Sequence, residues 1–96
     1  MVYLQASIKL RAGKLQDFVS LINGLTPVVA KHGWKLLGSY ATVVGRLNTV
    51  MDLWELPNEA ALQAALSDSE MAKHAPRINE IIEDEILTLF NKLPIS

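Results

Sequence analysis

The first ten residues alternate between apolar and polar side chains, and this pattern then changes abruptly. One face of residues 2–10 carries Val2, Leu4, Ala6, Ile8 and Leu10, and the other carries Tyr3, Gln5, Ser7 and Lys9. A period of two predicts a strand with one buried face. From Lys14 the apolar residues adopt helical spacing, at Leu15, Phe18, Val19, Ile22, Leu25 and Val29. The chain therefore begins with a strand followed by a helix, whose apolar stripe we expect to cover the aliphatic face of that strand.

The rest of the chain predicts a hairpin, two helices and a last strand. In order, the pattern predicts strand 34–44, turn 45–48, strand 49–56, a short helix capped by Asn58, a second helix from about Glu70, and strand 85–93. Residues 85–93 fit a helix continuation equally well. We favour the strand because it completes a common closed topology, βαββααβ.

The predicted fold class is α+β, ferredoxin-like, with a four-stranded antiparallel sheet and helices on one face. The length of 96 residues indicates one domain, residues 1–96. Half of the residues are hydrophobic, which is high for one small core. We therefore expect part of the apolar surface to lie in a subunit interface.

Composition excludes several classes of protein. Without cysteine, neither a disulfide scaffold nor a cysteine-ligated zinc site can form. The net charge of -1 argues against a nucleic-acid-binding protein. The longest uncharged apolar-rich run, residues 36–45, is about half of a membrane span, and the N-terminus does not resemble a signal peptide. We expect a cytoplasmic protein that binds no nucleic acid and no membrane. Motifs for nucleotide binding, zinc proteolysis and serine hydrolysis are missing from the sequence.

The sheet face away from the helices is expected to be mixed in character. On the assumption that Met51 and Leu53 face the helices, this open face would carry Tyr3, Gln5, Ser7, Lys9, Trp34, Leu36, Gly38, Tyr40, Thr42, Asn48, Val50, Asp52 and Trp54. Two such faces packed together in a homodimer would enclose a cavity suited to a small molecule. The alternative is that these side chains simply fill the space between the two sheets.

Several short motifs resemble one known family. They are Lys31-His32-Gly33, Gly38-Ser39-Tyr40, Gly45, Asn48 and Asp52-Leu53-Trp54-Glu55 followed by a short helix. With the element order, they are similar to the NIPSNAP family of the dimeric α+β barrel superfamily, which is related to antibiotic-biosynthesis-type monooxygenases. The resemblance implies a ferredoxin-like fold and a homodimer whose two sheets form a barrel, but it implies little chemistry. Members often carry a His two residues before this Trp, where this chain has Asp52.

Two enzymatic branches of the superfamily offer different chemistry. His74 lies where the haem-degrading branch places an iron-ligating His, but that branch also needs an Asn on the first strand and a Trp on the second helix. This chain has neither, so no cofactor and no metal are expected. The cofactor-free oxygenase branch is a closer resemblance, because it uses a pocket of Asn, Trp and Tyr to deprotonate and hold a substrate that itself reacts with oxygen.

The candidate site residues follow from that resemblance and from the expected open face. Asp52 or His74 would be the catalytic base, and Asn48 or Tyr40 would hydrogen-bond a developing enolate. The candidate substrate-binding residues are Tyr3, Trp34, Tyr40, Asn48 and Trp54. Burial should raise the pKa of Asp52 unless Lys9 or Arg11 pairs with it. The structural alternatives are packing for the two tryptophans and an ion pair for Asp52.

Two functions from different classes are therefore predicted. The first is a cofactor-independent oxygenase or isomerase acting on a small aromatic or dicarbonyl compound. The second is a non-catalytic ligand-binding or dimeric assembly module. A cavity of several hundred Å³ lined by Asp52 would favour the enzyme. A filled barrel in which Asp52 is bridged to Lys9 or Arg11 would favour the module.

Overall fold

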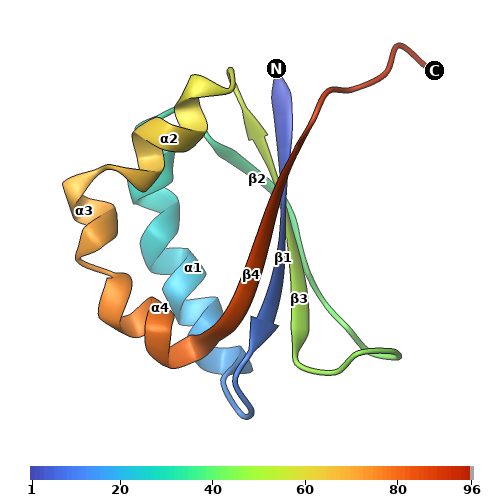
Figure 1. Cartoon of the computed structure of the whole chain (residues 1–96), viewed down its shortest axis with the longest axis vertical. Coiled ribbons are helices and arrows are strands. Elements are labelled where there is room, and N and C mark those ends of the chain that lie inside the picture. Colours follow the sequence, from blue (N-terminus) through green and yellow to red (C-terminus); the bar gives the residue numbers. More distant parts are fainter. Residues whose placement is uncertain (96) are drawn as a thin grey trace.

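One four-stranded antiparallel sheet carries all the helices on a single face (Figure 1). The computed structural model describes residues 1–95. Its elements are β1 (Val2–Leu10), α1 (Leu15–Ala30), β2 (Lys35–Ala41), β3 (Thr49–Leu56), α2 (Ala60–Leu66), α3 (Ser69–Ala72), α4 (Ala75–Ile81) and β4 (Ile82–Phe90). The strand order is β2-β3-β1-β4. The predicted α+β, ferredoxin-like class is confirmed.

The last strand and the second helix differ in detail from prediction. The end of the chain is a strand, as favoured, but β4 begins at Ile82 and pairs with β1. The expected single helix from Glu70 is two short helices, α3 and α4. Pro76 lies in the first turn of α4, where a missing N–H leaves no hydrogen bond unmade.

The connections around α1 and α2 follow their capping residues. Pro27 lies inside α1, and Gly33 follows the helix with a φ of +84°. A Cβ at Gly33 would stand 2.9 Å from the Pro57 ring, so glycine is required there for space as well as conformation. Asn58 caps α2 as predicted, because its side-chain oxygen accepts a hydrogen bond from the Ala61 N–H at 3.0 Å.

The core lies between the sheet and the helix layer, in two clusters. The aliphatic face of β1 contributes to both clusters, as the alternation predicted. One cluster is centred on Trp54 and Leu56 with α2, and the other on Phe18 and Leu21 of α1. Among residues 1–95, no helix has the length and hydropathy needed to cross a membrane.

The predicted orientation of β3 is wrong. Asp52 pairs with Ala6, so it faces the helices, and Val50, Trp54 and Leu56 are buried on the same side. Met51 and Leu53 face the open side instead. Both faces of residues 49–56 carry apolar side chains, and burying a Trp, a Val and a Leu removes more apolar surface from water than burying a Met and a Leu. That gain outweighs the burial of one carboxyl group.

The predicted orientation of β2 is half wrong, because this strand contains a bulge. Leu36 pairs with Trp54, but the next residue paired with β3 is Gly38, opposite Leu53. The extra residue, Leu37, reverses the faces of the strand. Trp34 and Leu36 therefore pack into the helix-side core, contrary to expectation, while Tyr40 lies on the open face as predicted.

Candidate functional site

A cavity of about 180 Å³ lies between the sheet and the helices. Its lining is almost entirely apolar and comes from β1, α1, β3, β4, the three short helices and the connection between α1 and β2. The apolar lining residues are Leu4, Ala6, Ile8, Phe18, Leu21, Ile22, Leu25, Val29, Trp34, Trp54, Leu66, Met71, Ile78, Ile82 and Leu87. Two carboxyl groups, those of Asp52 and Glu85, complete the lining. An apolar cavity with a few polar groups is the usual form of a small-molecule site.

Asp52 is a buried carboxyl group on the wall of this cavity. The residue is 1% exposed, and the Ser39 hydroxyl donates a hydrogen bond to its Oδ1 atom. Burial raises the pKa of Asp52 and outweighs the opposite effect of the Ser39 hydrogen bond. The two possible cationic partners are engaged elsewhere: Lys9 binds Glu83 at 2.9 Å and Arg11 binds the Asn79 carbonyl at 3.2 Å. The expected raised pKa is therefore confirmed, and the alternative ion pair is not formed.

Glu85 lies at the solvent side of the same cavity. It belongs to the edge strand β4, and its side chain keeps contact with solvent. Even so, the surrounding protein atoms raise the pKa of Glu85, and the negative charge of Asp52 raises it further. The cavity thus combines a deep carboxyl group with one close to solvent.

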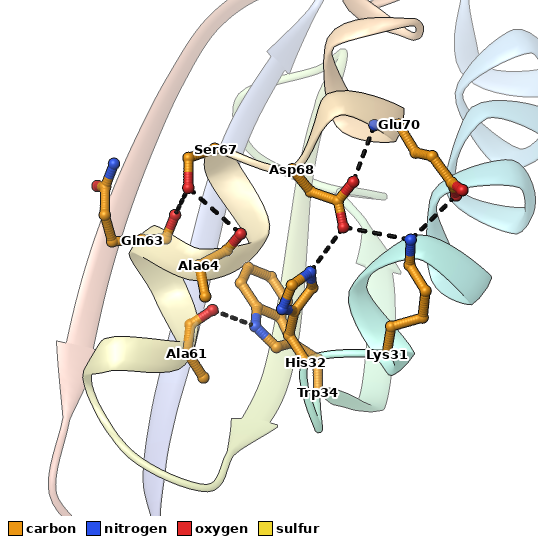
Figure 2. Close-up of polar contacts among 9 residues, drawn as sticks. All are labelled: Lys31, His32, Trp34, Ala61, Gln63, Ala64, Ser67, Asp68 and Glu70. Atoms are coloured by element: carbon orange, nitrogen blue, oxygen red, sulfur yellow. Dashed lines mark hydrogen bonds and ion pairs between the residues drawn. The ribbon is translucent and has the colours of Figure 1, made fainter.

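Two tryptophans form one end of the cavity wall. The ring centroids of Trp34 and Trp54 are 5.5 Å apart at an interplanar angle of 69°, an edge-to-face arrangement. The Trp34 indole N–H donates a hydrogen bond to the Ala61 carbonyl at 2.9 Å, which fixes the ring against α2 (Figure 2). Both residues therefore have a structural role in addition to lining the cavity.

The remaining candidate residues lie outside this cavity. Tyr3 and Tyr40 are on the open face of the sheet. Asn48 is exposed in the β2–β3 turn with a φ of +61°, and its carbonyl accepts a hydrogen bond from the Leu10 N–H. His74 precedes α4, beside Gly24 of α1, and is not among the lining residues. The structure therefore brings together Asp52, Trp34 and Trp54 and leaves the other four apart from them.

Two further polar side chains belong to the candidate site and were not predicted from the sequence, Ser39 and Glu85. Ser39 meets Asp52 only because the Leu37 bulge turns it toward the helix side. Glu85 belongs to an acidic run, residues 80–85. Such a run by itself predicts a solvent-exposed surface and gives no sign that one of its carboxyl groups lines a cavity. The pairing of Glu85 with Ile8 would have indicated the helix-side face, had the register been known. Among residues 1–95, no three His, Asp or Glu side chains gather as a metal site requires.

A charged cluster fastens the end of α1 to the start of α3 (Figure 2). Asp68 caps α3 by accepting a hydrogen bond from the Glu70 N–H at 2.8 Å. Its other oxygen accepts a hydrogen bond from His32 Nε2 at 2.7 Å and contacts Lys31 Nζ at 3.2 Å. The hydrogen bond from His32, the Glu70 N–H and Lys31 hold the pKa of Asp68 far below its usual value. His32 thus fastens the start of α3 to the end of α1.

A second hollow lies on the open face of the sheet. This broad groove of about 440 Å³ is lined by Tyr3, Leu37, Leu53, Phe90, Asn91 and Lys92. It carries no buried titratable group, so its character is that of a contact surface rather than a reaction site.

A family model described as NIPSNAP matches residues 3–94. The chain belongs to the NIPSNAP family. No curated protein matches its sequence significantly. The resemblance of the Lys31-His32-Gly33 and Asp52-Leu53-Trp54-Glu55 motifs to this family is therefore confirmed.

Solved structures share the fold at low sequence identity. An uncharacterised NIPSNAP domain protein from Burkholderia xenovorans is 18% identical, with a TM-score of 0.83 over 100% of this chain and 98% of its own. A NIPSNAP family protein with unknown function from Agrobacterium tumefaciens is 16% identical, with a TM-score of 0.81 over 100% and 91%. An antibiotic biosynthesis monooxygenase is 18% identical, with a TM-score of 0.72 over 98% and 100%. At these identities the likeness concerns the fold alone.

Proposed function

We propose that this NIPSNAP protein is a cofactor-independent enzyme that removes a proton from a small, mostly apolar carbonyl or phenolic compound bound in the helix-side cavity. The observation that carries the proposal is Asp52, a carboxyl group without a cationic partner on the wall of an apolar cavity. Groups with a perturbed pKa in a cavity are frequent acid–base catalysts. In this proposal Asp52 is the base, and His74 has no part because it does not line the cavity.

The size of the cavity limits the substrate. An apolar protein cavity of about 150 Å³ accommodates benzene. The present cavity, about 180 Å³, suits one six-membered ring with a small substituent. A compound of several fused rings would not fit. The substrate class is therefore one-ring ketones, 1,3-diketones and phenols, which is narrower than the small aromatic or dicarbonyl compounds predicted from the sequence.

The chemistry follows from the position of Asp52. Its free oxygen would take a proton from the carbon next to a carbonyl or from a phenol, while the Ser39 hydroxyl holds the other oxygen. The resulting enolate or phenolate has two possible fates. It is reprotonated, which gives an isomerase, or it reacts with molecular oxygen, which gives an oxygenase. Because a raised pKa makes Asp52 a stronger base than an exposed aspartate, the same burial supports both reactions.

Hydrogen–deuterium exchange tests the role of the base. In D₂O, wild type should exchange the C2 protons of cyclohexanone at least tenfold faster than buffer, followed as loss of the ¹H NMR signal. Asp52→Asn keeps the volume and the Ser39 partner but should reduce the rate to the buffer value. Glu83→Gln is the matched control, because Glu83 binds Lys9 outside the cavity. Exchange by Asp52→Asn at the wild-type rate would refute the proposal.

Oxygen uptake separates the two enzymatic outcomes. Incubation with cyclohexane-1,3-dione or a substituted phenol in air should consume oxygen faster than a buffer blank if the enzyme is an oxygenase. Exchange without oxygen uptake across this panel identifies an isomerase instead.

A non-catalytic ligand-binding module is the second candidate. The observation that favours it is the small volume of the cavity, about 180 Å³, which is short of the several hundred Å³ expected for an enzyme and leaves room only for a one-ring ligand. Saturable binding of cyclohexanone without any exchange above buffer would identify this function.

We also propose that the protein is a homodimer formed through the open face of the sheet. This face exposes large apolar side chains, including Tyr40 at 57% and Ile86 at 61%, and it contains the groove beside Phe90. Monomeric proteins rarely leave a large apolar area in water. The buried location of Trp54 and Asp52 means that the proposed catalytic cavity lies inside each subunit rather than between the two.

A further inference from the structure

We propose that Glu85 is a second catalytic residue, a proton donor that works with Asp52, and that the substrate class is therefore β,γ-unsaturated ketones isomerised by a 1,3-proton shift. This inference rests on the proposed function and adds an acid to its base. The observation is the juxtaposition of two carboxyl groups in one small apolar cavity, one deep and one near solvent.

The sheet register places the two carboxyl groups on the same face. Asp52 on β3 pairs with Ala6 of β1, and Glu85 on β4 pairs with Ile8 of β1. The two residues thus flank the central strand from opposite sides, offset by two positions. On β1, Ala6 lies opposite Asp52 and Ile8 lies opposite Glu85, and Ala6 is the smallest side chain on the helix-facing side of this strand. The space that Ala6 leaves is where a small ring could contact both carboxyl groups.

One oxygen of Asp52 remains available to a ligand. Within residues 1–95, the hydrogen bond from Ser39 reaches only Oδ1. In the same part of the chain, no side-chain oxygen is both fully buried and without a hydrogen-bond partner. The Oδ2 atom is therefore not fully buried, and because Asp52 lines the cavity, this is the oxygen that a ligand there could reach.

The two carboxyl groups favour complementary protonation states. Burial favours the protonated form of each group, and at Asp52 the Ser39 hydrogen bond offsets part of that effect. The negative charge of Asp52 disfavours a second charge on Glu85, so the pair holds one proton more readily than either group alone. A state with one proton on Glu85 and none on Asp52 is the one that a base and an acid need. Because Glu85 is the group in contact with solvent, it can recover a proton from water after each turnover.

The proton transfers balance. The Asp52 carboxylate takes a proton from the carbon between the carbonyl and the double bond, and the C–H electron pair forms a dienolate. The γ-carbon of the dienolate then takes the proton of Glu85, which gives the conjugated ketone. Asp52 is left protonated and Glu85 ionised, and exchange with water restores both. No oxidant, metal or cofactor takes part.

The test follows the isomerisation of cyclohex-3-enone to cyclohex-2-enone by the rise of conjugated-enone absorbance. Wild type should exceed the buffer rate. Glu85→Gln should lower the isomerisation rate at least tenfold, yet keep most of the C2 exchange of cyclohexanone, which needs only the base. Glu85→Asp restores a carboxyl group and should recover part of the isomerisation. Glu83→Gln, a carboxylate lost from the same strand outside the cavity, should match wild type.

The outcomes distinguish a failure of the donor role of Glu85 from a failure of the base role of Asp52. Selective loss of isomerisation in Glu85→Gln, with recovery in Glu85→Asp, supports the donor role. Isomerisation at the wild-type rate in Glu85→Gln overturns it, and so does an equal loss of exchange and isomerisation. If wild type exchanges cyclohexanone but does not isomerise cyclohex-3-enone, the donor role fails while the base role stands. If Asp52→Asn retains both activities, the proposed function itself fails.

Discussion

Asp52 is the residue whose position has the clearest consequence for stability. A carboxyl group with a raised pKa binds its proton more tightly in the folded than in the unfolded chain. Its contribution to stability is therefore complete below the unfolded value, near pH 4, and is lost as the pH rises through the folded pKa. At neutral pH this aspartate opposes folding. Residues that oppose folding are expected at functional sites, where chemistry needs a strained or desolvated group.

Asp52→Asn should accordingly stabilise the protein at pH 7 and leave it unchanged near pH 3. Each unit by which the pKa is raised corresponds to about 1.4 kcal/mol. For a domain of this size, 1 kcal/mol moves Tm by about 4–8 °C. Thermal unfolding followed by circular dichroism at the two pH values measures the effect.

The control for this prediction is Glu83→Gln, which should not raise Tm at pH 7. Lys9 lowers the pKa of Glu83, chiefly through a hydrogen bond, so Glu83→Gln should leave Tm unchanged or lower it slightly at pH 7. A lower Tm for Asp52→Asn at pH 7 would mean that the carboxylate is a structural group.

Among the elements, α3 depends most on a single side chain. It has four residues, which is too short for helix formation without outside support. Asp68 supplies that support by capping α3 and by binding His32 and Lys31 at the end of α1 (Figure 2). Because α3 carries Met71 into the cavity wall, this cluster also holds the shape of the candidate site.

Asp68→Ala should lower Tm by several degrees at pH 7, and the difference should shrink as the pH falls below about 4. The sign follows from the lowered pKa of Asp68: its stabilisation is present above the unfolded value and is lost on acidification through the folded one. Differential scanning calorimetry over this pH range measures it. Asp17→Asn removes an exposed carboxylate whose contact with Lys14 is 3.8 Å, and it should change Tm little. Equal effects of the two substitutions would contradict the anchoring role.

The order of the elements and the orientation of β1 were predictable from the sequence, whereas the orientation of β2 and β3 was not. The alternation in β1 has one aliphatic face, so its burial could be assigned directly. In β3 both faces are apolar, and the burial of Trp54 decides between them only once the helices are in place. In β2 the Leu37 bulge reverses the faces, and a bulge of this kind leaves no signal in the hydrophobic period.

The candidate site was also only partly predictable: Asp52 was identified from the sequence, whereas Glu85 and Ser39 were not. Asp52 stood out as a carboxyl group between apolar neighbours, and its environment was foreseen although its face was not. Glu85 and Ser39 depend on cross-strand register, which is set by contacts between segments more than ten residues apart. Asn48 had the right chemical type but lies in the turn, because the hairpin needs a residue that tolerates positive φ there.

At the scale of the whole molecule, both faces of the sheet carry large apolar side chains, but only one face is covered by helices (Figure 1). The covered face holds the core and the cavity. The open face carries Met51 and Leu53, which the inverted orientation of β3 places there, together with Tyr40 and Ile86. The hydrophobic residues that one small core does not need thus lie, in part, on the open face of the sheet. Pairing two open faces would cover it and leave both cavities intact.

The protein should therefore migrate as a dimer, at twice its chain mass of 10.6 kDa, in size-exclusion chromatography with light scattering. Leu53→Glu places a charge at the middle of the open face, on β3 next to the central strand, and should shift the mass to that of one chain. Its far-ultraviolet circular dichroism should stay that of the folded protein, because Leu53 lies outside the core clusters.

Val44→Glu is the matched control for this substitution. It introduces the same charge at a residue that is 92% exposed in the loop between β2 and β3 rather than on a strand of the sheet, and it should remain dimeric. Because the proposed cavity lies within one subunit, a folded Leu53→Glu monomer should still exchange the C2 protons of cyclohexanone. A wild-type monomer at concentrations of about 100 µM would contradict the dimer, since stable interfaces of roughly 1,200–2,000 Å² persist far below that concentration. A monomeric variant without exchange activity would instead show that the partner subunit completes the site.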